Sequence, residues 1–402
     1  MKRKSVIHPI LIAILAIGCS SDKQAKDSLP SIDVRKNYPE KEIILTDIAD
    51  VTYLHLNTDD DDYLYDEYPQ LQMTNNTIVI ADDSGNILFF SKDGNPKSRF
   101  NRKGGGPEEY LQTGRILYDE DSDEVFVTMP DSRVIQVYSS TGKHKRKIVL
   151  PQSTLMNFCE LFDDRSLIIY DENRRLRKFF SDDKNLSDDK NLLIDYFDTP
   201  FVRISNIDGK VLDYIEMSDF DIVLRDERNT AVGSNIPGRT TRLIKCKEGA
   251  LLCNPETDTV FLYGKDYSLT PLICKTPSVK TMDPMVYMNN CLDMGRYQFM
   301  EIFTVRWEEG AFPFPVKYYM RDKETGEVFR QKIILPDYKG KEFIISRSQS
   351  RIGDENNVHF ELDLFELKEA YNENKLSGKL KELVATLNED EDNNVFMFVE
   401  FK

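Results

Sequence analysis

Short runs of alternating hydrophobic and polar residues recur along most of this chain. They are rich in Val, Ile, Phe and Tyr, and many of them are separated by Gly, Asp, Asn and Ser. Branched and aromatic residues favour strands, and the small polar residues between them favour hairpin turns. The pattern therefore predicts an all-β fold. The expected strands are 42–45, 77–80, 87–90, 124–128, 134–138, 166–170, 201–204, 259–263, 317–321 and 343–345.

A repeat of this strand pattern is visible in the first half of the chain. The segment that ends at Gly94 lines up with the segment that ends at Gly142, and Phe90 then falls on Tyr138. Repeats of roughly 40 to 60 residues with four short strands are typical of β-propellers, because one such unit cannot bury both of its faces alone. The strand-and-turn ending of the repeat returns at 202–209 and 318–326, and in a looser form, with its glycine shifted to Gly264, at 260–267.

The C-terminal part of the chain departs from the repeat. Residues 365–372 and 377–387 have the spacing of amphipathic helices, and an apolar strand is expected at 395–401. We expect this last strand to pair with the first strand, near 42–45, and to close the ring. Closure of this kind removes two exposed strand edges.

The N-terminus has the features of an export signal. A cationic start is followed by an apolar run at 10–17, which is too short to span a bilayer as a helix. Cys19 comes directly after Gly18, and this junction resembles the lipobox of bacterial lipoproteins, which implies a diacylated Cys19 as the mature N-terminus. The expected organisation is a lipoprotein signal peptide at 1–18, a flexible tether at 19–40 and one propeller domain at 41–402.

The charge of the chain limits its partners. Removal of the signal peptide takes away Lys2, Arg3 and Lys4 and changes the formal net charge from −16 to about −19. Such a surface excludes nucleic acid as a partner and disfavours anionic lipid headgroups, so we expect membrane contact only through the N-terminal lipid. The expected location is the outer membrane, with both periplasmic and surface orientations left open.

A glycine-rich turn carries a resemblance to a known family. Residues 104–110 read Gly-Gly-Gly-Pro-Glu-Glu-Tyr and lie between two hairpin-like segments. Together with 45–56, the hairpin ending at Gly94 and the ending 376–401, this turn resembles the six-bladed β-propeller lipoproteins of Gram-negative gut-type bacteria, which are similar to NHL-repeat propellers. Glu108 replaces the last glycine of the usual turn. The resemblance implies six blades, short C-terminal helices, export and anchoring, but no settled activity.

Two basic residues precede the same turn and suggest anion binding. Arg102 and Lys103 stand directly before the glycines at 104–106, where backbone amides and cations together can hold an anion. A phosphate-binding loop of the Walker type is excluded, because the Gly-Lys-Ser/Thr ending and a following helix are missing. A tight connection between two blades is the favoured interpretation.

Trp307 is the second candidate for ligand contact. It is the single tryptophan of the chain and stands in a Pro-rich, charged segment typical of a loop. An aromatic residue at the mouth of a propeller would suit a ligand, whereas packing between blades is the alternative.

Histidine and cysteine give little support for catalysis or metal binding. The three mature histidines, His55, His144 and His359, belong to no hydrolase or zinc motif, so we expect no metal and no cofactor. The spacing of Cys246 and Cys253 would suit a disulfide between neighbouring strands, but buried free thiols are the favoured interpretation.

The sequence thus favours a lipid-anchored propeller that acts as a non-catalytic binding or scaffold protein. The expected ligand is a glycan, a peptide or a partner protein, held at one face of the central channel. The alternative is an enzyme, a carboxylate-based polysaccharide hydrolase or lyase, which needs two suitably placed acids. No oligomeric state follows from the sequence.

Overall fold

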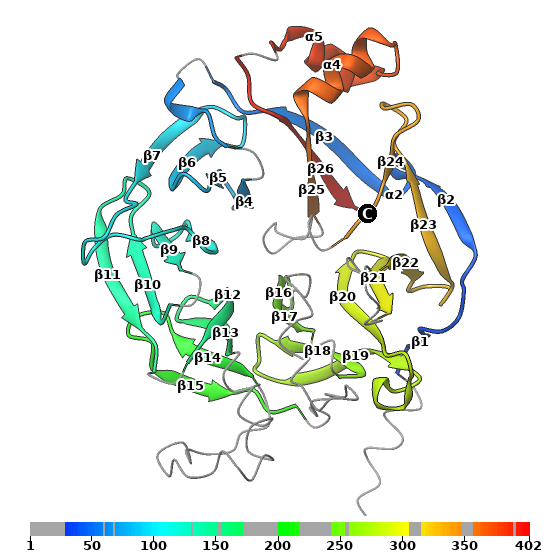
Figure 1. Ribbon diagram of the computed structural model, residues 1–402, viewed down its shortest axis with the longest axis horizontal. Coiled ribbons are helices and arrows are strands. Elements are labelled where there is room, and N and C mark those ends of the chain that lie inside the picture. Colours follow the sequence, from blue (N-terminus) through cyan, green and yellow to red (C-terminus); the bar gives the residue numbers. More distant parts are fainter. Residues whose placement is uncertain are drawn as a thin grey trace, which may run out of the picture.

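The strands lie in sheets arranged side by side around a common centre, which is the arrangement of a β-propeller (Figure 1). The predicted all-β propeller is therefore confirmed. The computed structural model describes residues 29–58, 61–66, 69–129, 132–151, 154–171, 200–217, 243–253, 257–304, 315–346, 357–388 and 391–402.

Five of the described sheets are blades with at least four strands. In each blade the first strand lies nearest the centre of the ring, and successive hairpin strands run antiparallel towards the outside (Figure 1).

Blade 1 contains β4 (Gln70–Met73), β5 (Thr77–Ala81), β6 (Asn86–Ser91) and β7 (Pro96–Asn101). Blade 2 contains β8 (Ile116–Asp119), β9 (Glu124–Thr128), β10 (Val134–Tyr138) and β11 (His144–Val149). Blade 3 contains β12 (Met156–Asp163), β13 (Ser166–Asp171), β14 (Phe201–Ser205) and β15 (Val211–Tyr214). Blade 4 contains β16 (Leu243–Cys246), β17 (Gly249–Leu252), β18 (Thr259–Gly264) and β19 (Leu269–Thr276). Blade 5 contains β20 (Val286–Met294), β21 (Tyr297–Thr304), β22 (Val316–Asp322) and β23 (Val328–Ile334), with the short β24 (Glu342–Phe343) beside β23.

The remaining described sheet has only three strands, and we call it the closing sheet. Its order is β25 (Asn357–Leu362), β26 (Val395–Phe401) and β3 (Ala49–His55). Between β25 and β26 the chain forms helices α4 (Leu364–Asn372) and α5 (Gly378–Thr386), as expected from the helical spacing, and not a further hairpin. The expected count of six blades is therefore corrected to five blades and a three-stranded closing sheet. Short helical turns occur at α2 (Leu45–Ile48), η1 (Asp61–Tyr63) and η4 (Val279–Thr281).

The two ends of the chain meet in the closing sheet. β26 runs antiparallel to β3, with Val399 opposite Val51 and Phe401 opposite Ala49. Pairing between the last strand and an N-terminal strand was expected, but the partner 42–45 was wrong. Residues 40–44 form a different strand, β2 (Glu40–Ile44), which pairs in parallel with β23.

The N-terminal segment covers the outer edges of two blades. β1 (Ser31–Asp33) adds in parallel to β19, and β2 adds in parallel to β23 (Figure 1). Unpaired edge strands are sites of unwanted strand addition, and these two blades have their outer edges occupied by the chain itself. The strand β1 lies inside the range 19–40 that the sequence suggested as a tether.

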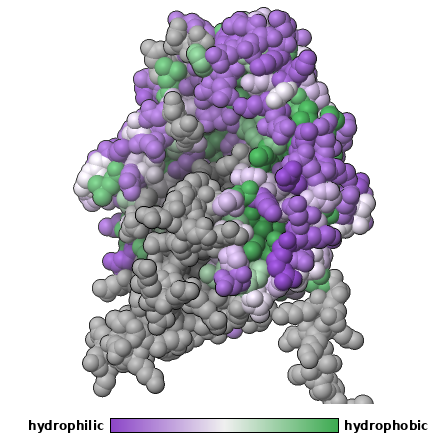
Figure 2. All heavy atoms as spheres, turned by 45° about the vertical axis from the view of Figure 1, so that its right-hand side comes forward, coloured by the Kyte–Doolittle hydropathy of each residue, from purple (hydrophilic) through white to green (hydrophobic). Residues whose placement is uncertain are grey.

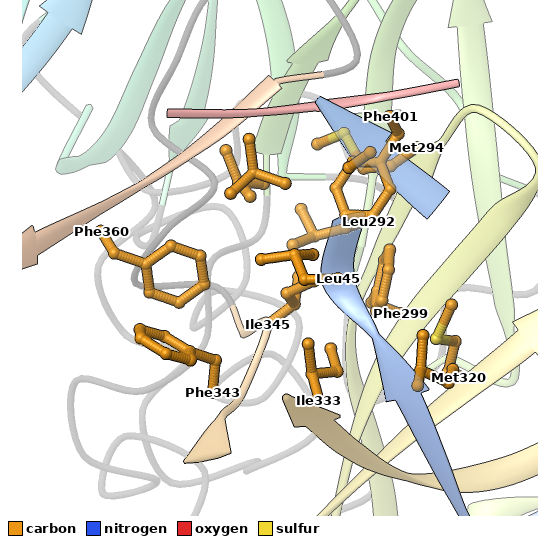
Figure 3. Packing of buried hydrophobic residues seen from close by; sticks show 14 of the residues in the cluster. Leu45, Leu292, Met294, Phe299, Met320, Ile333, Phe343, Ile345, Phe360 and Phe401 are labelled. Atoms are coloured by element: carbon orange, nitrogen blue, oxygen red, sulfur yellow. The ribbon is translucent and has the colours of Figure 1, made fainter. Parts of the chain in front are cut away.

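Aromatic side chains link neighbouring blades. The rings of Phe89 in blade 1 and Tyr118 in blade 2 meet edge to face with centroids 5.2 Å apart. A larger cluster joins blade 5 to both termini, and Figure 3 shows Phe299 against Phe401 and Phe343 against Phe360. Burying one such ring stabilises the fold by about 2–3 kcal/mol, so these contacts fix adjacent sheets to one another.

Two structural features explain why glycine occupies this position of the repeat. Gly94 and Gly142 each have a positive φ, +80° and +76°, in the turn between the third and fourth strands of a blade. Each also abuts the preceding sheet, since an added Cβ would lie 2.5 Å from the His55 carbonyl oxygen or from Phe100 Cβ. Gly209 and Gly326 take the corresponding turns of blades 3 and 5.

The surface on the side of β2 and β23 is mainly hydrophilic. Figure 2 shows the hydrophobic residues of this face in scattered groups and not in one continuous patch. Within the part of the chain that the structure describes, no helix is long and apolar enough to span a bilayer.

Candidate binding site in the channel

The inner strands of blades 1 to 3 surround a cavity of about 740 Å³. Its wall comes from β4, β8 and β12, and its mouth from the turns that follow β12 and β18. These inner strands lie nearest the centre of the ring in Figure 1. We call this cavity the channel site.

Two glutamines of β4 join blade 1 to blade 2 along the channel wall. The Oε1 of Gln72 accepts from the Tyr118 amide at 2.6 Å, and its Nε2 donates to the Tyr118 carbonyl at 3.3 Å. Gln70 bonds two residues of the next blade, accepting from the Ile116 amide and donating to the Gly114 carbonyl. A primary amide carries both a donor and an acceptor. It can therefore satisfy the backbone groups of the neighbouring inner strand, which would otherwise need a paired strand.

An ion pair joins blade 2 to blade 3 in the same wall. The Arg115 guanidinium contacts the Glu160 carboxylate of β12. The Glu160 side chain is 8% exposed and that of Arg115 is 28% exposed. A carboxylate at this depth is costly unless a cation and hydrogen bonds accompany it, so the pair acts as a fixed part of the wall.

Glu120 at the edge of the cavity is likewise bound into the structure. It accepts from the Thr77 hydroxyl at 2.5 Å and from the Asn76 amide at 3.0 Å, both in blade 1. Burial would raise the pKa of Glu120, but these hydrogen bonds outweigh it and the pKa is lowered. Glu120 is therefore ionised, and its hydrogen bonds link blade 2 to blade 1.

Tyr267 stands at the mouth of the channel site, in the turn between β18 and β19. It is 50% exposed, and its hydroxyl donates to Asp163 Oδ2 of blade 3 at 3.2 Å. The guanidinium of Arg203 lies over its ring at 4.3 Å from the centroid. Lys245 and Lys265 also line the cavity. The mouth thus combines an exposed aromatic ring with charges of both signs.

Arg102 and Lys103 lie outside the channel site. The Nε of Arg102 donates to the Gly142 carbonyl at 3.1 Å, and the Nζ of Lys103 donates to the Asp83 carbonyl at 2.8 Å. Both cations therefore bind main-chain oxygens of neighbouring turns. Arg102 lines a second hollow of about 530 Å³ beside the glycine turn.

The glycine turn already holds a carboxylate of its own chain. Gly106 N donates to Glu109 Oε2 at 2.7 Å, and an added Cβ on Gly104 would lie 2.1 Å from the same oxygen. Tyr110 fixes the turn further, because its hydroxyl donates to the Gly85 carbonyl at 2.7 Å. The interpretation as a tight connection between blades fits this geometry, since the position suited to an anion is filled by Glu109.

Other candidate residues are placed as follows. Cys19 and Trp307 lie outside the described residues. In the hairpin of β16 and β17, Cys246 pairs with Gly249 while Leu252 pairs at the far end, so Cys246 and Cys253 lie at opposite ends and cannot form a disulfide. Burial raises the pKa of the Cys246 thiol to about 11.

Each of the three described histidines contacts a different neighbour. His144 lies 3.0 Å from Gln136 Oε1, His55 lies 3.3 Å from Asp392 Oδ1, and His359 packs beside the ring of Phe396. Among the described side chains, no three from His, Cys, Asp and Glu come together in a way that could hold a metal ion.

The residues that build the channel site were not identified from the sequence. Gln70 and Gln72 stand in a four-residue strand with no distinguishing pattern. For Tyr267 the sequence did contain one signal, because the looser copy of the repeat at 260–267 ends at this residue. The glycine of this copy is shifted to Gly264, and Tyr267 takes the turn position that Gly94 and Gly142 take in their blades.

The fold and the cavity define a β-propeller with a ligand-sized hollow at its centre. The chain belongs to the family described as Domain of unknown function (DUF4934), which matches residues 29–400. It is similar to a solved Bacteroides fragilis protein described as exported, with a TM-score of 0.60 and 19% identity over 93% of this chain and 100% of that chain. A Bacteroides vulgatus member of the DUF4221 family has a TM-score of 0.45 and 11% identity over 88% of this chain and 97% of that chain. No curated protein matches the chain. At this identity the likeness to the B. fragilis protein shows the fold alone.

Proposed function

We propose that this protein is a lipid-anchored, non-catalytic binding protein of the cell envelope, which holds a glycan, peptide or protein ligand at the channel site. The observation that carries the proposal is the cavity of about 740 Å³ walled by three inner strands. Small-molecule sites commonly measure about 300–1,000 Å³ and are largely formed before the ligand binds. Here amides and an ion pair hold the wall in place without a ligand.

The state of Glu120 and Glu160, two of the six acids that line the cavity, favours binding over hydrolysis. A glycoside hydrolase needs a carboxylic acid with a raised pKa opposite a second carboxylate. Glu120 has a lowered pKa and four hydrogen-bonding groups around it, and Glu160 is paired with Arg115. These two acids are engaged in joining blades and are poorly suited to proton transfer. The hydrolase or lyase remains the alternative that the experiment below tests.

The one face shown in Figure 2 favours a small or extended ligand over a flat docking partner. The face in Figure 2 carries no single continuous hydrophobic area among its described residues. A scaffold for permanent assembly would need such an area, since stable interfaces have apolar cores. A ligand that enters the channel site needs none.

The location is part of the proposal. The export signal, Cys19 after Gly18 and the likeness to a protein described as exported all support an outer-membrane lipoprotein that faces the periplasm or the cell surface. The tether would then be the segment between Cys19 and β1. We also propose that the closing sheet takes the place of a sixth, incomplete blade.

The test uses the detergent-solubilised full-length protein and a variant with a blocked channel. Asn75 lines the cavity in the turn after β4 and is exposed, so Asn75→Trp fills part of the cavity with little effect on the fold. Asn95 is exposed in a neighbouring turn outside the cavity, and Asn95→Trp is the matched control. Binding is measured on oligosaccharide and peptide arrays, and new reducing ends are measured after incubation with polysaccharides.

We expect a ligand that binds the wild type and Asn95→Trp but binds Asn75→Trp at least tenfold more weakly, without new reducing ends. Release of reducing ends by the wild type would show that the protein is an enzyme. Equal binding by both tryptophan variants would place the site elsewhere.

A further inference from the structure

Tyr267 occupies a turn position that other blades reserve for glycine. Its amide donates to the Gly264 carbonyl at 2.8 Å, as the amide of Gly94 donates to the Ser91 carbonyl at 2.9 Å in blade 1. The φ of Tyr267 is +63°, and that of Gly94 is +80°. The same hairpin turn is therefore closed by a tyrosine in blade 4 and by a glycine in blade 1.

This tyrosine is held in an unfavourable backbone conformation. Left-handed φ values bring Cβ close to the carbonyl oxygen and are rare for bulky side chains. The penalty corresponds to roughly a tenfold lower folding equilibrium constant than glycine would give at this position. Such strain persists at sites where function requires the side chain, whereas glycine would serve the turn better.

Tyr267 lines the cavity, and its ring packs against Phe162 and Tyr263 with centroids 6.1 and 6.3 Å apart. Asp163 Oδ2 accepts a hydrogen bond from the Tyr267 hydroxyl at 3.2 Å, and the Arg203 guanidinium lies 4.3 Å from the centroid of the ring. The residue as a whole is nevertheless 50% exposed, whereas Tyr263 is 2% exposed. A tyrosine that served packing alone would be buried like Tyr263. Tyr267 is fixed in orientation and still available for contact.

The chemistry around this ring fits a carbohydrate. A rigid aromatic ring gives a large contact area with a polar handle, and it can lie against the C–H face of a sugar. Sugar hydroxyls donate and accept at once, and the mouth offers acceptors on Asp163 and Asp164 and donors on Lys245 and Lys265. A phosphate ligand would require cations without the carboxylates. An apolar peptide would require an apolar anchor pocket.

We propose that Tyr267 is the stacking residue of an oligosaccharide site at the mouth of the channel. This inference rests on the proposed binding function and names its ligand class. The strained backbone at Tyr267 is then tolerated because the ring is needed at this position.

Stability and binding are expected to change in opposite directions on removal of the ring. Tyr267→Gly should raise Tm by about 2 °C because it relieves the backbone, and it should weaken oligosaccharide binding at least tenfold. Tyr267→Phe keeps the ring and loses only the contact with Asp163, so its affinity should stay within about threefold of the wild type. A purely structural tyrosine would give the reverse, a lower Tm and unchanged binding.

The chain offers a reciprocal control for the strain. Gly326 takes the corresponding turn in blade 5 with φ of +73°, and an added Cβ there meets no atom within 4 Å. Gly326→Tyr should therefore lower Tm by a similar amount and leave binding unchanged. Phe365 on α4 is 59% exposed and lies outside the cavity, so Phe365→Ala controls for loss of an exposed ring.

The experiment measures Tm by calorimetry and affinity by titration with hexasaccharides of glucose, xylose, mannose and N-acetylglucosamine, and with a hexapeptide library. Binding of one hexasaccharide, lost in Tyr267→Gly and kept in Tyr267→Phe, is the expected result. Binding of a hexasaccharide with equal affinity by Tyr267→Gly would overturn the role of Tyr267 and leave the proposed function intact. Binding of a peptide alone would overturn the carbohydrate class, and no binding at all would overturn both proposals.

Discussion

Gln72 and Tyr118 form a two-way hydrogen-bonded pair across the boundary between blades 1 and 2. The Gln72 side chain accepts from the Tyr118 amide at 2.6 Å and donates to its carbonyl at 3.3 Å. One side chain thereby satisfies both backbone groups of a residue on an inner edge strand. The stability of the channel wall depends on this exchange as well as on hydrophobic packing.

Replacing Gln72 with methionine should therefore destabilise the protein. Gln72→Met keeps the length of the side chain but leaves the Tyr118 amide and carbonyl without this partner, at a cost of about 1–3 kcal/mol in the free energy of unfolding. Gln72→Glu keeps the acceptor and loses the donor, so its free energy of unfolding should lie between those of the wild type and Gln72→Met. Denaturant unfolding measures all three proteins. A Gln72→Met variant as stable as the wild type would show that the pair contributes nothing.

The Arg115–Glu160 ion pair should show strong coupling in a double-mutant cycle. Arg115→Met removes the cation from a carboxylate that is 8% exposed and should cost about 3 kcal/mol. The double variant Arg115→Met, Glu160→Gln removes the charge as well, so it should recover part of that loss. Urea unfolding of the four proteins gives the coupling energy. Strictly additive effects would mean that the two side chains do not act as a pair.

The closing sheet should be required for cooperative unfolding. Deletion of 395–402 removes β26, which is the central strand between β25 and β3. We expect the calorimetric transition to broaden or split, because the ring then lacks the strand that joins β25 to β3. The milder variant Val399→Asp buries a charge at a position that is 0% exposed and should cost several kcal/mol. A single sharp transition with unchanged Tm after deletion would refute the role of β26.

The loss of stability between pH 4 and pH 2 should depend on Asp322. It receives two hydrogen bonds from Arg296, at 2.9 and 2.5 Å, which lower the pKa of Asp322 to about 2. Because the pKa is lower in the folded than in the unfolded state, the pair stabilises the protein above about pH 4, and this contribution is lost as the pH falls towards 2. With allowance for solvent screening at Arg296, the contribution is about 1 kcal/mol.

The measurement compares the wild type with Asp322→Asn in urea from pH 6 to pH 2. The difference in the free energy of unfolding should shrink towards zero at the acidic end. A difference that is constant across this range would show that the carboxylate charge is not responsible. Asp93→Asn, in an exposed turn of blade 1, is the control.

Much of the fold follows from the sequence because blades are local structures. The strands at 124–128 and 134–138 were predicted with the bounds that β9 and β10 have, since hydrophobic runs and hairpin turns determine them within a few residues. The strand β3 was missed. Its side chains are mostly half-buried, so the residues do not alternate strongly, and its pairing depends on β26 from the far end of the chain.

The candidate site depends on contacts that no local pattern encodes. Gln72 matters because its strand faces β8 of the next blade, and Glu160 matters because Arg115 reaches it from another blade. These relationships arise only when the ring closes. Arg102 and Lys103 have a conspicuous sequence context, yet they bind main-chain oxygens. Tyr267 is the exception, because comparison of turn positions between repeats marks it as unusual.

The parallel strands β1 and β2 also determine how a mechanical load would enter the molecule. Under the proposed anchoring at Cys19, a pull from the membrane reaches β1 on the rim of blade 4, then β2 on the rim of blade 5, and only then β3 in the closing sheet. Two sets of hydrogen bonds outside the ring must yield before force is applied to the junction of the termini. The N-terminal segment would thus protect the ring from shear when a large bound ligand is dragged past the cell.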